Sequence, residues 1–200
     1  MKQTMVFSFN GLILIILLIL SLYFDLTRKK IPNFLTFPVM IWGLAYYTFS
    51  GGLGGFLFSI KGLLLGAAIF FIPFALGGMG GGDVKLMGAI GAVKGAAFVF
   101  QAAVFTALCG GILAVIVLII NGRLLKTMKK VLGMLAVPFL QMLSFRFRNP
   151  YLFQLAQFFQ VPQESREEKK IVLPYGVAIT LGTLLVLSNL GVQWFSFNFF

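Results

Sequence analysis

The sequence predicts an all-α membrane protein, a polytopic bundle of about six transmembrane helices. Hydrophobic residues make up 60% of the 200 residues and charged residues only 10%, whereas soluble domains are about 25% charged. So few polar side chains could not cover so much apolar surface in water. The apolar residues also gather in runs of about 17–25 residues, the length that a helix needs to cross a bilayer.

Six apolar runs account for most of the chain. The first is followed by Arg28, Lys29 and Lys30 and has no small-residue cleavage site, so we expect a retained helix rather than a signal peptide. The fourth is the weakest, because Lys85 and Lys94 interrupt it. The expected spans are residues 6–24, 34–50, 56–76, 84–100, 102–120 and 171–190. We expect them to form a single membrane-embedded domain over residues 1–200.

The basic residues indicate how the chain is oriented. The 16 basic and 5 acidic residues give a net charge of +11, which in a membrane protein marks loops beside anionic lipid rather than a nucleic-acid site. With the N-terminus outside, the inner segments 25–33, 77–85 and 121–170 carry 3, 1 and 9 basic residues, and only 3 lie elsewhere. We therefore predict an outside N-terminus, contact with membrane lipid and no nucleic-acid partner.

Residues 121–170 form the one sizeable aqueous or interfacial segment that the spans leave. The stretch 131–145 is apolar but short and contains Pro138, so we expect a helix that lies in the interface or re-enters it. Residues 160–170 are polar, and we expect them to be exposed.

The residue types that are missing exclude several kinds of site. Histidine is absent and Cys109 is the only cysteine, which excludes a disulfide, a Cys or His zinc site and a nucleophile activated by histidine. We expect no metal and no cofactor. The acidic residues are Asp25, Asp83, Glu164, Glu167 and Glu168, and we interpret the three glutamates as a solvated charge run. Two carboxylates therefore remain for chemistry at the membrane.

Asp25 and Asp83 are expected at the same membrane face, because the chain crosses the bilayer twice between them. Each has a structural alternative: Asp25 could pair with Arg28 or Lys29 at the surface, and Asp83 could be a helix N-cap. Two close carboxylates cannot both ionise cheaply, so such a pair holds one proton. The ionised member can then take a proton from water while the protonated member hydrogen-bonds a scissile carbonyl. This is the chemistry of an aspartic peptidase.

Residues 77–82 contain five glycines in six positions and cannot form a stable helix interior. We interpret them as a pliable loop that presents Asp83 to a substrate backbone; the alternative is a simple turn between helices. A phosphate-binding loop is excluded, because the residue after Gly82 is Asp83 and not lysine.

Three motifs, in order along the chain, resemble those of the type IV prepilin peptidases, which are GxGD intramembrane aspartyl proteases. They are Asp25 followed by Ile31-Pro32-Asn33, then Gly80-Gly81-Gly82-Asp83 continued by Val84-Lys85-Leu86-Met87-Gly88-Ala89, and finally Leu173-Pro174-Tyr175-Gly176. The resemblance covers about residues 6–190, although 121–170 carries none of the motifs.

The resemblance implies an endopeptidase of the bacterial inner membrane with Asp25 and Asp83 as the catalytic pair. Its substrates would be prepilins or pseudopilins of type IV pilus and protein secretion systems, cut after a short basic leader at the cytoplasmic face. The residues expected to shape the loop or contact substrate are Gly80, Gly82, Pro32, Asn33, Lys85, Pro174 and Gly176. Asn33 is also a candidate cap of the second span, and Lys85 a candidate anchor at the inner face.

One departure concerns methylation. Many members of the family carry two CxxC pairs in an additional cytoplasmic region, and this chain has no CxxC. It therefore resembles the short branch of the family, and we expect neither methyltransferase activity nor an S-adenosylmethionine cofactor.

Two other functions are compatible with intramembrane aspartates. The first is an ion or proton transporter that uses them for its cargo. The second is a non-catalytic subunit that assists the assembly of a pilus or a secretion system.

Overall fold

The computed structural model describes residues 9–122, 124, 125, 127, 128, 132 and 175–188. These residues contain no strand, and the helices are α1 (Phe9–Arg28), α2 (Asn33–Ala75), α3 (Gly81–Ile120) and α6 (Tyr175–Leu187). The first three are long and apolar enough to cross a membrane. The predicted all-α, membrane-helical class is therefore confirmed, while the number of six crossings stays a prediction.

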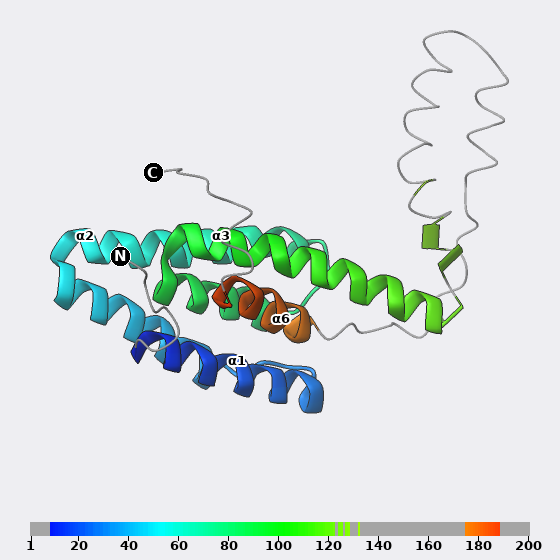
Figure 1. Ribbon diagram of the computed structural model, residues 1–200, viewed down its shortest axis with the longest axis horizontal. Helices are drawn as coiled ribbons and strands as arrows, with labels where there is room; N and C mark the ends of the chain where they lie inside the picture. Colours follow the sequence, from blue (N-terminus) through cyan, green and yellow to red (C-terminus); the bar gives the residue numbers. More distant parts are fainter. Residues whose placement is uncertain (1–8, 123, 126, 129–131, 133–174, 189–200) are drawn as a thin grey trace, which may run out of the picture. The chain divides into compact units, whose positions relative to one another are not determined.

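Helices α2 and α3 are each too long for one straight crossing. They contain 43 and 40 residues, or roughly 60 Å of helix at about 1.5 Å per residue, against a hydrocarbon core of about 30 Å. Each is interrupted by a glycine with positive φ, Gly52 at φ 58° and Gly95 at φ 82°. Both helices reverse direction (Figure 1).

The sequence predicted the position of the interruption in α2 but not that of the interruption in α3. Gly52 lies between the expected spans 34–50 and 56–76, as the apolar pattern predicted. Gly95 lies inside the expected span 84–100, so the predicted boundary at residue 101 is wrong. The break occurs where a glycine tolerates φ 82°, not where the apolar run weakens.

The polar backbone at the break in α3 is satisfied by side chains of α2. The break interrupts the hydrogen-bond ladder to which the carbonyls of Ala92 and Val93 belong. Ser59 Oγ donates to Ala92 O at 2.7 Å, and Tyr47 Oη donates to Val93 O at 2.9 Å. Irregular backbone at membrane depth needs such partners, because lipid supplies none.

Glycines allow α2 and α3 to approach closely. A Cβ atom on Gly43 would lie 2.7 Å from Ala92 O, and one on Gly66 would lie 2.5 Å from Met87 O. Gly62 and Gly91 face each other in the same way. Since Gly43 and Gly66 lie on opposite sides of the break at Gly52, both legs of α2 pack against the first leg of α3.

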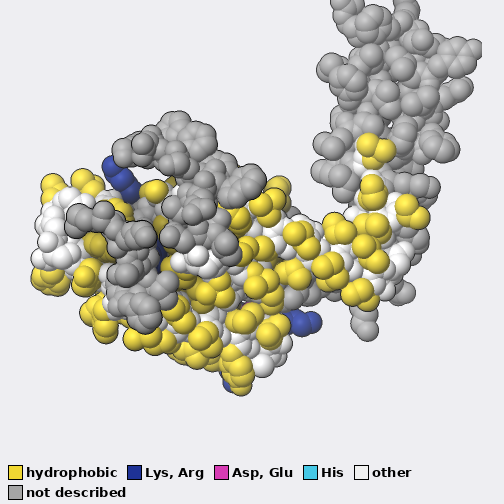
Figure 2. Space-filling model, viewed as in Figure 1, with side chains coloured by type: hydrophobic (Ala, Val, Ile, Leu, Met, Phe, Trp, Pro, Cys, Tyr) yellow, Lys and Arg dark blue, Asp and Glu magenta, His cyan; other side chains and the backbone are white. Residues whose placement is uncertain are grey.

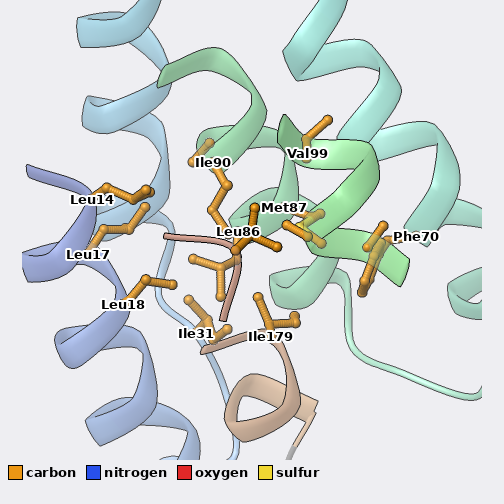
Figure 3. Packing of buried hydrophobic residues seen from close by; sticks show 14 of the residues in the cluster. Leu14, Leu17, Leu18, Ile31, Phe70, Leu86, Met87, Ile90, Val99 and Ile179 are labelled. Carbon is orange, nitrogen blue, oxygen red and sulfur yellow. The ribbon is translucent and has the colours of Figure 1, made fainter. Parts of the chain in front are cut away.

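One apolar core joins all four helices. Helix α1 packs against α2 and α6, and Figure 3 shows side chains of α1, α3 and α6 directed into one cluster, among them Leu14, Leu86 and Ile179. The outer surface is also apolar: on the face shown in Figure 2, hydrophobic side chains cover most of the described helices. An apolar exterior around an apolar core is the pattern of a protein surrounded by lipid.

The chain divides into two compact units, residues 1–111 with 174–200 (unit 1) and residues 112–173 (unit 2). In unit 2 the described part is mainly the end of α3, where Gly122 has φ 63°. The expected interfacial helix at 131–145, the glutamates at 164–168 and Pro174 lie outside the described residues. The single domain over 1–200 stays a prediction.

Candidate active site

Asp25 lies in the last turn of α1, which ends at Arg28. Only 8% of the residue is exposed. Its Oδ2 accepts a hydrogen bond from the backbone N–H of Gly176, at the start of α6, at 2.8 Å. The guanidinium of Arg28 lies instead 5.5 Å from the ring centroid of Phe24, and no ion pair to Asp25 is formed by the described basic residues. The surface ion pair is therefore not the environment of Asp25.

Gly176 has no room for a side chain. A Cβ atom there would lie 2.6 Å from Oδ2 of Asp25 and 2.8 Å from its Cβ. Only glycine lets the first turn of α6 reach the carboxylate so closely, and the positive end of that helix then faces a negative group. The structure thus brings one predicted site residue, Gly176, directly to another, Asp25.

Asp83 lies in the first turn of α3 and is only 7% exposed. Its Oδ2 accepts a hydrogen bond from Gly80 N at 3.1 Å, and its own N–H donates to Gly80 O at 3.1 Å. Gly80, not Asp83, precedes the helix, so Asp83 caps α3 from the third helical position, as the acid of a capping box does. The expected N-cap position was therefore off by three residues, although a capping bond is present.

The start of α3 rests on the connection between α1 and α2. A Cβ atom on Gly82 would lie 3.0 Å from Cβ of Ile31 and 3.3 Å from its backbone N and O. Ile31 is buried in the core and follows Asp25 by six positions. This contact brings the two carboxylates to the same end of unit 1.

Lys85 and Asn33, two further predicted site residues, contact each other. Lys85 Nζ donates to Asn33 Oδ1 at 2.9 Å and lies 5.5 Å from the ring centroid of Phe37. The cap of α2 is Pro32, with φ −74° and ψ 147° and no side-chain capping bond. The expectation that Asn33 caps this helix is therefore wrong, because Asn33 is the first helical residue and its side chain accepts from Lys85.

Ile31 and Phe37 are neighbours of the site that sequence reasoning did not select. Ile31 belongs to the motif that follows Asp25, but its residue type did not indicate that it would support Gly82. Phe37 follows Asn33 by one helical turn, and that spacing was the available signal.

The arrangement is a pair of buried carboxylates held by backbone donors. Among the described residues, each carboxylate accepts one hydrogen bond, and both bonds are made at Oδ2. A carboxylate can accept several more hydrogen bonds, so each retains capacity for water or for a substrate group. No group of three or more His, Cys, Asp or Glu side chains that could hold a metal is found in the described part of the chain.

Comparison with known protein families gives one match. The model of the type IV leader peptidase family matches residues 12–115, just over half of the chain, and this range includes Asp25 and Asp83. No curated protein and no solved structure matches the chain significantly.

Proposed function

Because the chain belongs to the type IV leader peptidase family, we propose that it is an intramembrane aspartyl endopeptidase with Asp25 and Asp83 as its catalytic pair. It removes the basic leader of prepilins or pseudopilins at the cytoplasmic face of the bacterial inner membrane. The outside N-terminus expected from the basic residues belongs to the same proposal, because it places both aspartates on the cytoplasmic side.

The proposal is supported by two buried carboxylates, Asp25 and Asp83, that are 58 positions apart in sequence and lie at the same end of unit 1. Burial and mutual repulsion make a doubly ionised pair costly, so the pair holds one proton. The ionised carboxylate accepts a proton from water as the water oxygen attacks the scissile carbonyl carbon. The protonated carboxyl donates a hydrogen bond to the carbonyl oxygen. As the C–N bond breaks, the leaving amine takes the proton that the other carboxylate accepted from water, and the pair again holds one proton.

The two backbone donors fix the orientation of the carboxylates during this step. The N–H of Gly176 holds Oδ2 of Asp25, and the N–H of Gly80 holds Oδ2 of Asp83. Rigid backbone donors lower the cost of orienting reacting groups in the transition state. Gly80 and Gly176 are thus proposed to act through the aspartates, while Gly82 brings the helix of Asp83 against Ile31.

The test is co-expression with candidate prepilins, read by the loss of the leader and by the N-terminal residue of the product. Asp25→Asn and Asp83→Asn should each accumulate in the membrane and leave the prepilin uncut. Glu164→Gln, an equivalent acid-to-amide change in the polar segment 160–170, should process the prepilin normally. Cleavage by either aspartate variant would refute the role of that residue. Aspartate-dependent cation or proton flux in liposomes, without cleavage, would support the transporter instead.

A further inference from the structure

Lys85 connects the helix that carries Asp83 to the first turn of α2. Its Nζ donates to Asn33 Oδ1 at 2.9 Å, and the same ammonium lies 5.5 Å from the ring centroid of Phe37. Asn33 is the first residue of α2, and Phe37 lies one turn further along. A single side chain of α3 therefore has a directional polar contact and a cation–π contact on one helical end.

The bond between Lys85 and Asn33 lies close in sequence to both aspartate-bearing helices. Lys85 follows Asp83 by two residues, and Asn33 begins the helix that follows α1 after the short connection 29–32. The bond thus links the first turns of Asp83's helix to the segment that leaves Asp25's helix. The contact of Gly82 with Ile31 already brings these segments together, and the contacts that glycines of α2 make with α3 begin further along α3, at Met87. The bond of Lys85 to Asn33 adds a directional contact near the start of α3, before those contacts begin.

We infer that Lys85 is a positioning residue, whose hydrogen bond to Asn33 fixes the rotation of the first turn of α3 and thereby the position of the Asp83 carboxyl relative to that of Asp25. The inference rests on the proposed function, because only a reaction that uses both carboxyls requires their separation to be held. One water and one carbonyl must fit between the pair, and a misplacement of about 1 Å can cost about 100-fold in rate.

A lysine that only anchors a helix end in the headgroup region would act differently. Such a side chain extends its ammonium to water and lipid phosphate, whereas the ammonium of Lys85 is directed to an amide oxygen and an aromatic ring of the same protein. Arg28, Lys29 and Lys30 lie exposed nearby and are sufficient as anchors. In contrast to these three, Lys85 joins two of the described helices.

The experiment is a double-mutant cycle on the full chain in liposomes, with kcat and KM for leader cleavage measured separately. Lys85→Met removes the donor but keeps a long side chain that packs on Phe37, and Asn33→Leu removes the acceptor at similar size. Each should lower kcat about 10- to 100-fold with little change in KM. The double variant should be no slower than the slower single variant, because both changes break the same bond.

Two further variants separate positioning from other roles. Asn33→Asp keeps the acceptor and should retain most of the kcat. Lys30→Met removes an exposed positive charge of the same end and should leave both constants unchanged. If Lys85→Met does not accumulate, Asn33→Leu and Asn33→Asp carry the test, since they differ in the acceptor while Lys85 is intact.

Three results would overturn the inference: rate losses that multiply in the double variant, a rise in KM with unchanged kcat, or an unaltered kcat in Asn33→Leu. Asp83→Asn in the same assay keeps the two proposals apart. If that variant still cleaves the leader, the proposed function fails, whatever Lys85 does. If it is inactive while Lys85→Met and Asn33→Leu are fully active, only the positioning role fails.

Discussion

At the end of unit 1 where α2 and α3 are broken, the hydroxyls of Ser59 and Tyr47 donate to backbone carbonyls of α3. At the end that holds Asp25 and Asp83, backbone N–H groups donate to side-chain carboxylates. We call these the break end and the carboxylate end. Figure 1 shows the two reversals at the opposite end of unit 1 from the end of α1 and the start of α6.

The difference lies in which groups remain available. At the break end, each hydroxyl donates its only proton to a carbonyl at the interruption of the helix. The polar atoms there therefore satisfy one another. At the carboxylate end, each carboxylate accepts one bond from the described backbone and keeps further acceptor capacity. Both ends contain irregular backbone in an apolar protein, but in the described part of the chain the carboxylates of Asp25 and Asp83 keep acceptor capacity that the carbonyls at the break have used. Substitutions at the two ends should therefore change different quantities.

Apart from changes to the aspartates themselves, the largest effect on activity is expected from Gly176→Ala at the carboxylate end. The new Cβ would lie 2.6 Å from Oδ2 of Asp25, so the carboxyl must move or lose its backbone donor. We expect a loss of about 100-fold in kcat for leader cleavage. The matched control is Gly110→Ala, at another contact of α6, where the new Cβ would lie at an ordinary 3.6 Å from Cβ of Ala178. Equal kcat values for the two variants would contradict the expectation.

The break end should respond to Gly95→Ala with a loss of stability rather than of chemistry. Gly95 has φ 82°, and a Cβ there would overlap the ring of Phe58. The backbone strain alone should lower the free energy of unfolding by about 1–3 kcal/mol. Thermal unfolding in detergent measures the loss. Gly111→Ala is the control, because it lies in the same helix with open space at its Cβ.

The activity of Gly95→Ala sharpens the comparison between the two ends. The fraction that remains folded should cleave leader with the wild-type kcat, since the break end contributes no group to the carboxylates. A folded Gly95→Ala protein with strongly reduced kcat would mean that the two ends are coupled, and the separation argued above would fail.

What the sequence could predict about these ends depended on the kind of interaction. Counting crossings between Asp25 and Asp83 was enough to expect them at one face, because topology needs only apolar run lengths. The kink at Gly95 was missed, since 23 glycines occur in the chain and residue type alone does not say which one adopts a positive φ. Likewise, the bond between Lys85 and Asn33 joins residues 52 positions apart, and its existence depends on how α3 is rotated.

An effect of intermediate size on stability is expected from Ser59→Ala. The change removes the donor to Ala92 O and leaves a buried carbonyl at the break without that partner. Hydrogen bonds between membrane helices contribute about 0.6–2 kcal/mol, so we expect a destabilisation of about 1 kcal/mol in reversible unfolding in detergent. Ser50→Ala, at an exposed hydroxyl on the same helix, should change stability by much less. Identical losses in the two variants would show that the carbonyl at the break does not depend on Ser59.

The smallest expected effect on stability, and the one of opposite sign, is that of Thr183→Val. The hydroxyl of Thr183 on α6 is buried and has no hydrogen-bond partner among the described residues. The same is true of the hydroxyls of Ser21 and Thr106. An unpaired buried hydroxyl costs free energy that an isosteric methyl group avoids. Thr183→Val should therefore leave the unfolding midpoint unchanged or raise it, whereas Thr180→Val removes a bond of 2.7 Å to Gly176 O and should lower it. A clear loss of stability in Thr183→Val would mean that this hydroxyl has a bound water as its partner, and that the interior between the ends is wetter than its apolar packing indicates.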